Sequence, residues 1–235
     1  MKPSLEPALS IFYPAHNEAE NLPALLAHAD TFIKQRSFPV EVIIVDDGSR
    51  DSTPEVMKTL MLQYPYLRHV RHDINQGYGA ALRTGFKSAR APLVFFTDGD
   101  NQFRLDELVE LLKLMESEKA DVVIGYRQNR QDNFMRKMNT FLWCSLVKLL
   151  LGIRFRDVDC AYKLFRKESL ESLNFTTTGA MISTELLFYL QKKNCKILEY
   201  PIKHYPRTAG NPTGAKISVI LRAFKELFLF YWRNT

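Results

Sequence analysis

Residues 40–51 read VEVIIVDDGSRD, an apolar run that ends abruptly in two aspartates and a turn. Its β-branched residues favour a buried strand, and a helical pattern over residues 53–64 follows directly. The same alternation recurs throughout residues 8–125. We expect strands at 9–13 (ended by Pro14), 40–45, 67–71, 93–97 and 121–125, and helices at 22–33, 53–64, 77–89 and 105–117. Such alternation forms βαβ units, so the sequence predicts an α/β fold with a mostly parallel sheet.

The second half of the chain is less regular. Helices are expected at 135–150, 183–194 and 215–232, strands at 161–166 and 196–200, and a loop rich in proline and glycine at 206–214. No repeat, linker or break in composition marks a boundary. We therefore expect one domain over residues 1–235, made of a first half at 8–125 and an elaborated second half at 126–235.

Composition excludes several classes of protein. With 235 residues, 46% of them hydrophobic and 25% charged, the chain is neither disordered nor collagenous. The three cysteines form no CxxC motif, which predicts reduced thiols in a cytoplasmic protein and no zinc knuckle. No apolar stretch is long enough to span a membrane, since the best candidate, residues 141–153, is short and contains Lys148. The net charge of +6 suggests phosphate-bearing partners, but no nucleic-acid-binding motif appears.

Acidic and polar residues follow three of the predicted strands. They read PAHNE at 14–18, DDGS at 46–49 and DGDNQ at 98–102. Ligands bind at the carboxyl ends of the strands in an open parallel sheet, where these segments would meet. Asp98 and Asp100 can face one hard cation, Mg²⁺ or Mn²⁺, with Gly99 allowing a tight turn and Gln102 completing the shell.

Two other sequence features do not indicate a cofactor or metal site. Residues 77–82, GYGAAL, approach the dinucleotide-binding fingerprint, but they follow the third strand and end in Leu82. We interpret them as a helix start that another backbone segment approaches closely. The five histidines are scattered and form no zinc-binding pair.

Basic residues gather in the second half of the chain. Arg127 and Arg130 follow the fifth strand, Arg136 and Lys137 come soon after, and Arg207 lies in the late loop. Arg127 and Arg207 are each close to a glycine and to the expected cleft. The helix at 215–232 carries basic and aromatic residues that suit contact with an anionic lipid surface.

Taken in order, these segments resemble family 2 glycosyltransferases of the GT-A fold, and among them the polyprenol-phosphate sugar transferases typified by dolichol-phosphate mannosyltransferase. The resemblance covers nearly the whole chain. It rests on PAHNE at 14–18, VDDGSRD at 45–51, DGD at 98–100, GYR at 125–127, RKMNT at 136–140 and DCAYKLFRKE at 159–168, with Glu185 and Arg207 beyond them.

The resemblance implies a role for each matching position. The nucleotide would be held by Pro14, His16, Glu18, Asp46 and Asp47, together with Asp98. The metal would be held by Asp98, Asp100 and Gln102, and the acceptor by Arg127, Arg136, Thr140 and Asp159. Arg207 would close over the diphosphate, so that Asp100, Arg127, Arg136 and Arg207 form the catalytic set. The chain departs from the family in having His16 where tyrosine is common and in Gly99 and Asn101, and we expect no membrane helices after residue 235.

The implied reaction is a metal-dependent, inverting transfer of one sugar from a nucleotide sugar of the GDP-mannose or UDP-hexose type. The acceptor would be a polyprenyl phosphate at the cytoplasmic membrane face, with the protein in peripheral contact with the lipid. A phosphate acceptor needs no strong base, because it is largely ionised near pH 7. A saccharide hydroxyl acceptor would instead need a carboxylate base, from Asp157, Asp159 or Glu185. A protein that binds nucleotide sugar without turnover is a third possibility. The QxxRW motif of processive synthases is missing, which predicts single transfers.

Overall fold

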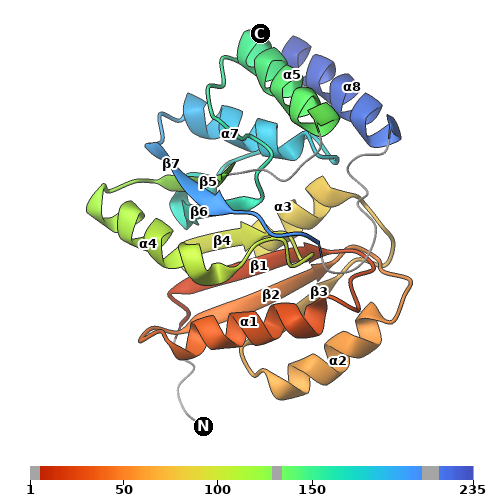
Figure 1. The fold of residues 1–235 in the computed structure, drawn as a ribbon, viewed down its shortest axis with the longest axis vertical. Helices are drawn as coiled ribbons and strands as arrows, with labels where there is room; N and C mark the ends of the chain where they lie inside the picture. The colour runs from red at the N-terminus through yellow and green to blue at the C-terminus, as the bar shows by residue number, and fades with distance from the viewer. Residues whose placement is uncertain (1–5, 129–133, 208–216, 235) are drawn as a thin grey trace.

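The computed structural model describes residues 6–128, 134–207 and 217–234, which form a seven-stranded sheet covered by helices on both faces (Figure 1). The strand order is β3-β2-β1-β4-β6-β5-β7, and β6 is the antiparallel member. The strands are β1 (Leu9–Ala15), β2 (Val40–Asp46), β3 (Leu67–Arg71), β4 (Leu93–Thr97), β5 (Val122–Gln128), β6 (Tyr162–Arg166) and β7 (Ile197–Lys203). The predicted α/β class with a mostly parallel sheet is confirmed.

The helices connect and cover these strands. They are α1 (Leu22–Lys34), α2 (Thr53–Gln63), α3 (Tyr78–Ser88), the 3₁₀ turn η1 (Leu105–Glu107), α4 (Leu108–Ser117), α5 (Phe134–Leu151), the short α6 (Lys167–Leu170), α7 (Ile182–Lys192) and α8 (Ile217–Asn234). In Figure 1, α1 and α2 lie at one end of the molecule, and α5 and α8 lie side by side at the other. Among the described residues, no helix combines the length and apolar character needed to cross a bilayer.

The order of the strands places a topological switch point at the carboxyl ends of β1 and β4, and this region is called the crevice below. The chain leaves β1 for β2 and β3 on one side, then returns to β4 on the other side, so that β1 pairs in parallel with both β2 and β4. Loops that leave adjacent strands in opposite directions diverge, and ligands of open α/β sheets bind in the gap between them. Two of the three acidic segments, those after β1 and β4, border this crevice directly.

The end of β1 differs from the prediction. The strand was expected to stop before Pro14, but it continues to Ala15, with Pro14 in register with Val45 of β2. The pairing of β1 with β4 ends earlier, at Phe12. Proline has no N–H group to donate to a neighbouring strand, and beyond Phe12 the strand β1 pairs with β2 alone.

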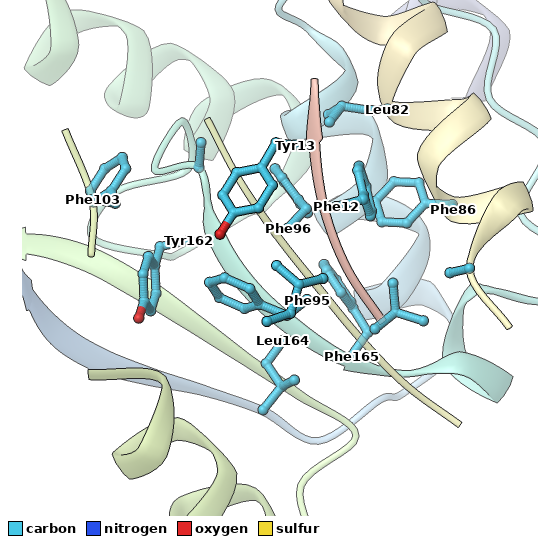
Figure 2. Packing of buried hydrophobic residues seen from close by; sticks show 14 of the residues in the cluster. Phe12, Tyr13, Leu82, Phe86, Phe95, Phe96, Phe103, Tyr162, Leu164 and Phe165 are labelled. Carbon is cyan, nitrogen blue, oxygen red and sulfur yellow. The ribbon is translucent and has the colours of Figure 1, made fainter. Parts of the chain in front are cut away.

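Aromatic side chains fix β4 and β6 in the middle of the sheet (Figure 2). The Phe96 ring stacks with Phe12 and with Phe165, at centroid distances of 5.4 and 6.1 Å, and Phe86 of α3 meets all three rings edge-on. Gly85 allows this approach, because a Cβ there would lie 2.2 Å from the Phe12 ring. The strand that delivers the Asp98 segment is therefore held rigidly.

A buried carboxylate ties strands together on β2. Glu41 accepts hydrogen bonds from the Ser10 hydroxyl (2.6 Å), the backbone N–H of Arg90 (2.7 Å) and the guanidinium of Arg68 (2.7 Å). Burial alone would raise the pKa of Glu41, but these donors outweigh it and hold the pKa below its usual value.

Candidate active site

The loops after β1 and β2 are joined by hydrogen bonds. The Nδ1 atom of His16 lies 2.9 Å from the carbonyl oxygen of Asp47, and the backbone N–H of Asn17 donates to the hydroxyl of Ser49 (2.8 Å). Asn17 adopts a left-handed conformation (φ 57°), which asparagine tolerates better than most residues. His16 and the start of the Asp46 segment are thus brought together, as the strand-end pattern predicted.

Asp46 and Asp47 are engaged within the protein. Asp47 accepts hydrogen bonds from the backbone N–H groups of Gln76 (2.9 Å) and Gly77 (2.8 Å), and its Oδ1 lies 2.7 Å from Nδ1 of His72. Asp46 is fully buried, accepts from the backbone N–H of Ser49, and lies 3.2 Å from Nε of Arg71. The two carboxylates shape the loops that border the crevice. Their direct contact with a nucleotide stays a prediction.

Asp98 and Asp100 lie next to each other beyond the end of β4. Asp98 accepts a hydrogen bond from the hydroxyl of Tyr78 (3.0 Å), and the buried Asp100 accepts one from the backbone N–H of Gln102 (3.1 Å). Burial and then the neighbouring Asp100 carboxylate raise the pKa of Asp98 to about 7. The hydrogen bond from Tyr78 and the charges of Arg127 and Lys163 oppose this rise in the pKa of Asp98.

Arg207 bridges the crevice. Its Nη2 donates to Glu18 from the β1 loop (2.6 Å), and its Nη1 donates to Asp100 from the β4 loop (3.3 Å). Burial raises the pKa of Glu18, although the hydrogen bonds from Asn21 and Arg207 oppose this shift. The predicted diphosphate arginine is therefore adjacent to the predicted metal-binding carboxylate, 107 residues away in the sequence.

Gln102 holds the segment that carries Arg207. The backbone N–H of Tyr205 donates to the carbonyl of Gln102 (2.9 Å), and the side-chain amide of Gln102 donates back to the carbonyl of Tyr205 (3.2 Å). The guanidinium of Arg104 lies 4.5 Å from the centre of the Tyr205 ring. Gln102 was predicted as a metal ligand, and the structure places its amide nitrogen on Tyr205, so its amide oxygen is the atom suited to a cation.

Arg127 is bound by Asp157 on the other side of β4. The carboxylate of Asp157 accepts from Nε (2.7 Å), Nη2 (2.8 Å) and the backbone N–H (3.3 Å) of Arg127. The two side chains are 11% and 5% exposed. Burial disfavours the charge of Arg127, but Asp157 outweighs it and raises the pKa of the guanidinium. The predicted role of Arg127 toward an acceptor phosphate stays a prediction.

The other predicted acceptor residues are placed differently. Asp159 is exposed on the loop that carries Asp157. Arg136 and Thr140 lie on α5, and their side chains are outside the described part of the chain. Glu185 is fully buried and accepts from the backbone N–H and hydroxyl groups of Thr176 and Thr177. Of the three carboxylates considered as bases, Asp159 is thus the one at the surface.

The glycines of the GYGAAL segment allow another backbone segment to approach closely, as we interpreted from the sequence. A Cβ on Gly77 would lie 2.7 Å from the carbonyl oxygen of Thr178, and one on Gly79 would lie 2.8–2.9 Å from the backbone carbons of Thr178. The backbone N–H of Gly79 donates to that same carbonyl (2.9 Å). The residue between the two glycines, Tyr78, supplies the hydroxyl that contacts Asp98.

The sequence analysis missed two residues near the site. Tyr78 contacts Asp98, and the fully buried Lys163 donates to the loop at Asp157–Cys160. A lysine inside the apolar strand YKLFR was a visible anomaly, because a buried ammonium is costly unless it has partners. Tyr78 carried no comparable sign in the sequence.

The donor atoms at this site fit a divalent cation. Asp98 and Asp100 offer hard carboxylate oxygens, which are the ligands that Mg²⁺ and Mn²⁺ prefer. Within the described residues no cluster of three or more acidic, histidine or cysteine side chains is arranged to hold a metal. A bound ion would therefore depend on a ligand for its remaining coordination, as Mg²⁺ and Mn²⁺ commonly do with phosphates.

A family model described as Glycosyl transferase family 2 matches residues 10–173, which include the strand-end segments and the Arg127–Asp157 pair. The chain belongs to glycosyltransferase family 2. The resemblance noted from the sequence is thereby confirmed, and the enzyme class follows from it. The match ends before Glu185 and Arg207, so the placement of those residues rests on the structure.

Curated relatives of this family 2 glycosyltransferase include transferases named for lipid phosphates. It is 30% identical over 209 residues to a dolichyl-phosphate beta-glucosyltransferase of Trichomonas vaginalis, covering 83% of this chain and 65% of that protein. It is 32% identical over 167 residues to an undecaprenyl-phosphate 4-deoxy-4-formamido-L-arabinose transferase of Serratia proteamaculans, covering 70% of this chain and 51% of that protein. The chain thus spans between half and two thirds of the length of these two relatives.

Solved structures agree with the family 2 assignment at the level of the fold. Glucosyl-3-phosphoglycerate synthase of Mycobacterium tuberculosis, solved with Mn²⁺, UDP and phosphoglyceric acid, superposes with a TM-score of 0.74 at 19% identity, over 96% of this chain and 78% of the other. Mannosyl-3-phosphoglycerate synthase of Rubrobacter xylanophilus gives a TM-score of 0.72 at 15% identity, over 97% and 75%. The predicted GT-A fold is confirmed by these likenesses.

Proposed function

We propose that this protein transfers one sugar from a nucleotide sugar to a polyprenyl phosphate at the cytoplasmic membrane face, with inversion and with Mg²⁺ or Mn²⁺ bound. The observation that carries the proposal is the Glu18–Arg207–Asp100 bridge across the crevice at β1 and β4. In this bridge the guanidinium of Arg207 contacts Asp100, a carboxylate that suits a metal ion. The contact lies at the end of the sheet where open α/β folds bind their ligands. The relatives named for dolichyl and undecaprenyl phosphates support the choice of acceptor.

On the donor side, Asp98, Asp100 and Gln102 would hold the cation. When bound, that ion would neutralise charge on the diphosphate leaving group. Arg207 would exchange its carboxylate partners for diphosphate oxygens, because a charged phosphate binds a guanidinium in the same two-pronged manner. Pro14, His16 and Glu18, with the loops that Asp46 and Asp47 shape, would border the nucleotide.

On the acceptor side, Arg127, Arg136 and Thr140 would orient the lipid phosphate, with Asp159 at the rim. A phosphate oxygen would form the new bond to the anomeric carbon, while the bond from that carbon to the diphosphate breaks and leaves its electron pair on the diphosphate. No proton has to be removed from the attacking oxygen, since the second pKa of a phosphate monoester is about 6. The burial of Glu185 and the pairing of Asp157 agree with a reaction that does not depend on either as a base.

The surface of α5 and α8 supports contact with a membrane. The two helices touch through the rings of Trp143 and Phe224 (5.5 Å), and together they carry seven of the ten large apolar side chains that are exposed among the described residues. These seven, the apolar surface of α5 and α8, are Met138, Leu142, Leu149, Leu221, Phe228, Leu229 and Trp232. They recur at helical spacing on each helix, next to the exposed bases Lys148, Lys225 and Arg233. Such a surface suits anionic lipid headgroups.

Radiolabelled transfer tests the reaction. A panel of GDP- and UDP-sugars is incubated with polyprenyl phosphate and Mg²⁺ or Mn²⁺, and label is expected in the butanol-extractable lipid. Asp100→Asn should abolish transfer, whereas Asp106→Asn, at an exposed aspartate of η1, should leave it unchanged. Label found only in water-soluble products would reject the lipid acceptor. Nucleotide binding without any transfer would reject the enzymatic proposal.

Vesicle flotation tests the membrane contact. We expect the protein to float with vesicles of phosphatidylcholine and phosphatidylglycerol at low salt, and less so as the salt concentration rises. The double variant Phe228→Ser/Trp232→Ser should lose this binding. Leu62→Ser, at a side chain 89% exposed on α2, should retain it as the matched control. Equal flotation of both variants would refute the assignment of the apolar surface of α5 and α8 to the membrane.

A further inference from the structure

Lys163 occupies the centre of the sheet without exposure to solvent. It lies on β6 between Phe96 of β4 and Ile124 of β5, and its Nζ atom is 5.6 Å from the centre of the Phe96 ring. Its β6 neighbours Tyr162 and Leu164 are fully buried and largely apolar. Burial of an ammonium group in such surroundings costs free energy unless hydrogen-bond partners compensate for it, so the partners of Lys163 explain its presence.

The ammonium group holds one short loop. Nζ donates hydrogen bonds to the carbonyl oxygens of Val158 (3.1 Å) and Cys160. These two carbonyls lie on either side of Asp159, whose side chain is exposed. Lys163 therefore fixes the backbone immediately before and after the surface carboxylate at the acceptor side.

The same loop is held from a second direction. Asp157, one residue before Val158, accepts three N–H donors from Arg127, and the backbone N–H of Cys160 donates to the carbonyl of Asp157 (3.3 Å). Lys163 on β6 and Arg127 on β5 thus both bind residues of the loop at 157–160. A change at either one can displace the other's partner.

We propose that Lys163 is a positioning residue for the acceptor: by holding the carbonyls that flank Asp159, it fixes Asp159 and the Arg127–Asp157 pair in the geometry that receives the acceptor phosphate. This inference rests on the proposed function. Loss of the ammonium leaves two buried carbonyls without their donor, and the loop must shift to solvate them. Misplacement of reacting or orienting groups by about 1 Å can cost on the order of 100-fold in rate.

Lys163→Met keeps an unbranched side chain that is one atom shorter, and it removes the charge and both hydrogen bonds. We expect kcat/KM for polyprenyl phosphate to fall about 30- to 100-fold, with the donor KM and the metal-dependent affinity for the nucleoside diphosphate within about twofold of wild type. Lys163→Arg, which keeps the charge and donors, should recover part of the loss. Lys87→Met, at an exposed lysine of α3, controls for the change in net charge and should behave as wild type.

A cycle with Asp159→Ala separates positioning from general stability. If Lys163 acts through the loop at 157–160, Lys163→Met should lower kcat/KM by a clearly smaller factor in the Asp159→Ala background than in wild type, because one of the groups that it positions is already absent. Losses that multiply fully in the double variant would overturn the proposal. A loss confined to nucleotide or metal binding would also overturn it, because it would place the action of Lys163 at Asp98.

Three outcomes of these experiments lead to different conclusions. If Lys163→Met does not fold, the same cycle is run with Lys163→Arg, for which an acceptor KM equal to that of wild type would overturn the proposal. If the wild-type protein uses another acceptor, the proposed function fails, and the cycle is run with the acceptor that it does use. If the wild-type protein uses polyprenyl phosphate and neither Lys163 variant changes its acceptor kinetics, this inference alone fails.

Discussion

Separating Arg127 from Asp157 should be one of the most destabilising changes near the site. Three N–H groups of Arg127 reach one carboxylate, at 2.7, 2.8 and 3.3 Å, and the paired side chains are 11% and 5% exposed. Removal of one member of a buried ion pair leaves an uncompensated charge and costs about 3–5 kcal/mol. We therefore expect Arg127→Met and Asp157→Asn each to lower the free energy of unfolding by about that amount.

The double variant distinguishes a buried pair from two independent contacts. Because neither charge is then left alone, Arg127→Met/Asp157→Asn should cost less than the sum of the two single changes, by about 2 kcal/mol or more. Urea unfolding followed by circular dichroism measures all four corners of the cycle. The exposed pair Glu110 and Lys113 (46% and 67% exposed) provides a control cycle, for which the coupling should be about 0.2–0.5 kcal/mol. Additive single losses below about 1 kcal/mol would refute the reasoning.

The same variants also separate the structural role of Arg127 from its proposed role at the acceptor. Asp157→Asn keeps the guanidinium but weakens the contacts that position it, so in assays well below the melting temperature the acceptor KM should rise less than it does in Arg127→Met. Arg127→Met removes the phosphate ligand and should raise the acceptor KM about 10- to 100-fold. Equal acceptor kinetics in the two variants would show that Arg127 acts on structure alone.

The remaining predictions concern stability away from the acceptor. Glu41→Gln should lower the free energy of unfolding at pH 7 by about 1–3 kcal/mol, because the carboxylate accepts three donors, one of them charged. The pKa of Glu41 is lowered on folding, so its stabilisation is present above the ordinary value of 4.5 and is lost as the pH falls through the folded-state pKa. Urea unfolding between pH 3 and 7 should therefore show a flatter acid limb for Glu41→Gln than for Glu55→Gln, at an exposed position on α2; identical limbs would contradict the prediction. Gly79→Ala should cost about 1–2 kcal/mol despite the gain in helix propensity of about 1 kcal/mol, because the new Cβ meets the backbone of Thr178 at 2.8 Å. A thermal melt measures this change, and a melting temperature at or above that of wild type would contradict it.

The sequence predicted the fold well where the evidence is local. Alternating apolar runs and helical periods identified β3 and β4 at their observed bounds and most other elements within a few residues, but they missed the short helix α6 and the division of residues 105–117 into η1 and α4. Local sequence patterns did not predict whether each strand runs parallel or antiparallel to its neighbours. The pattern of β6 is the same whether it runs parallel or antiparallel, and its direction depends on how the chain returns from α5 through residues 152–161. No local periodicity encodes that path.

For the site, the sequence predicted which segments lie close together but not which side chains contact each other. Strand ends of one sheet must meet, and this alone brought the segments at 14–18 and 98–102 together. Which oxygen each donor occupies depends on contacts between distant residues, such as Glu18 and Arg207, which are 189 positions apart. Asp47 illustrates the difference, because its predicted place is correct while its oxygens are occupied by His72 and by the backbone at 76–77.

The position of Arg207 connects these observations. Asp98, Asp100 and Glu18 gather three carboxyl groups at the crevice, and Arg207 contacts two of them. A diphosphate bound there would bring more negative charge and would compete with Glu18 and Asp100 for the guanidinium. Under the proposed function, a divalent ion held by Asp98 and Asp100 would supply positive charge for the diphosphate, and Arg207 would then be able to donate to phosphate oxygens. The segment that Gln102 anchors at Tyr205 carries Arg207, so this segment would accommodate the change of partners.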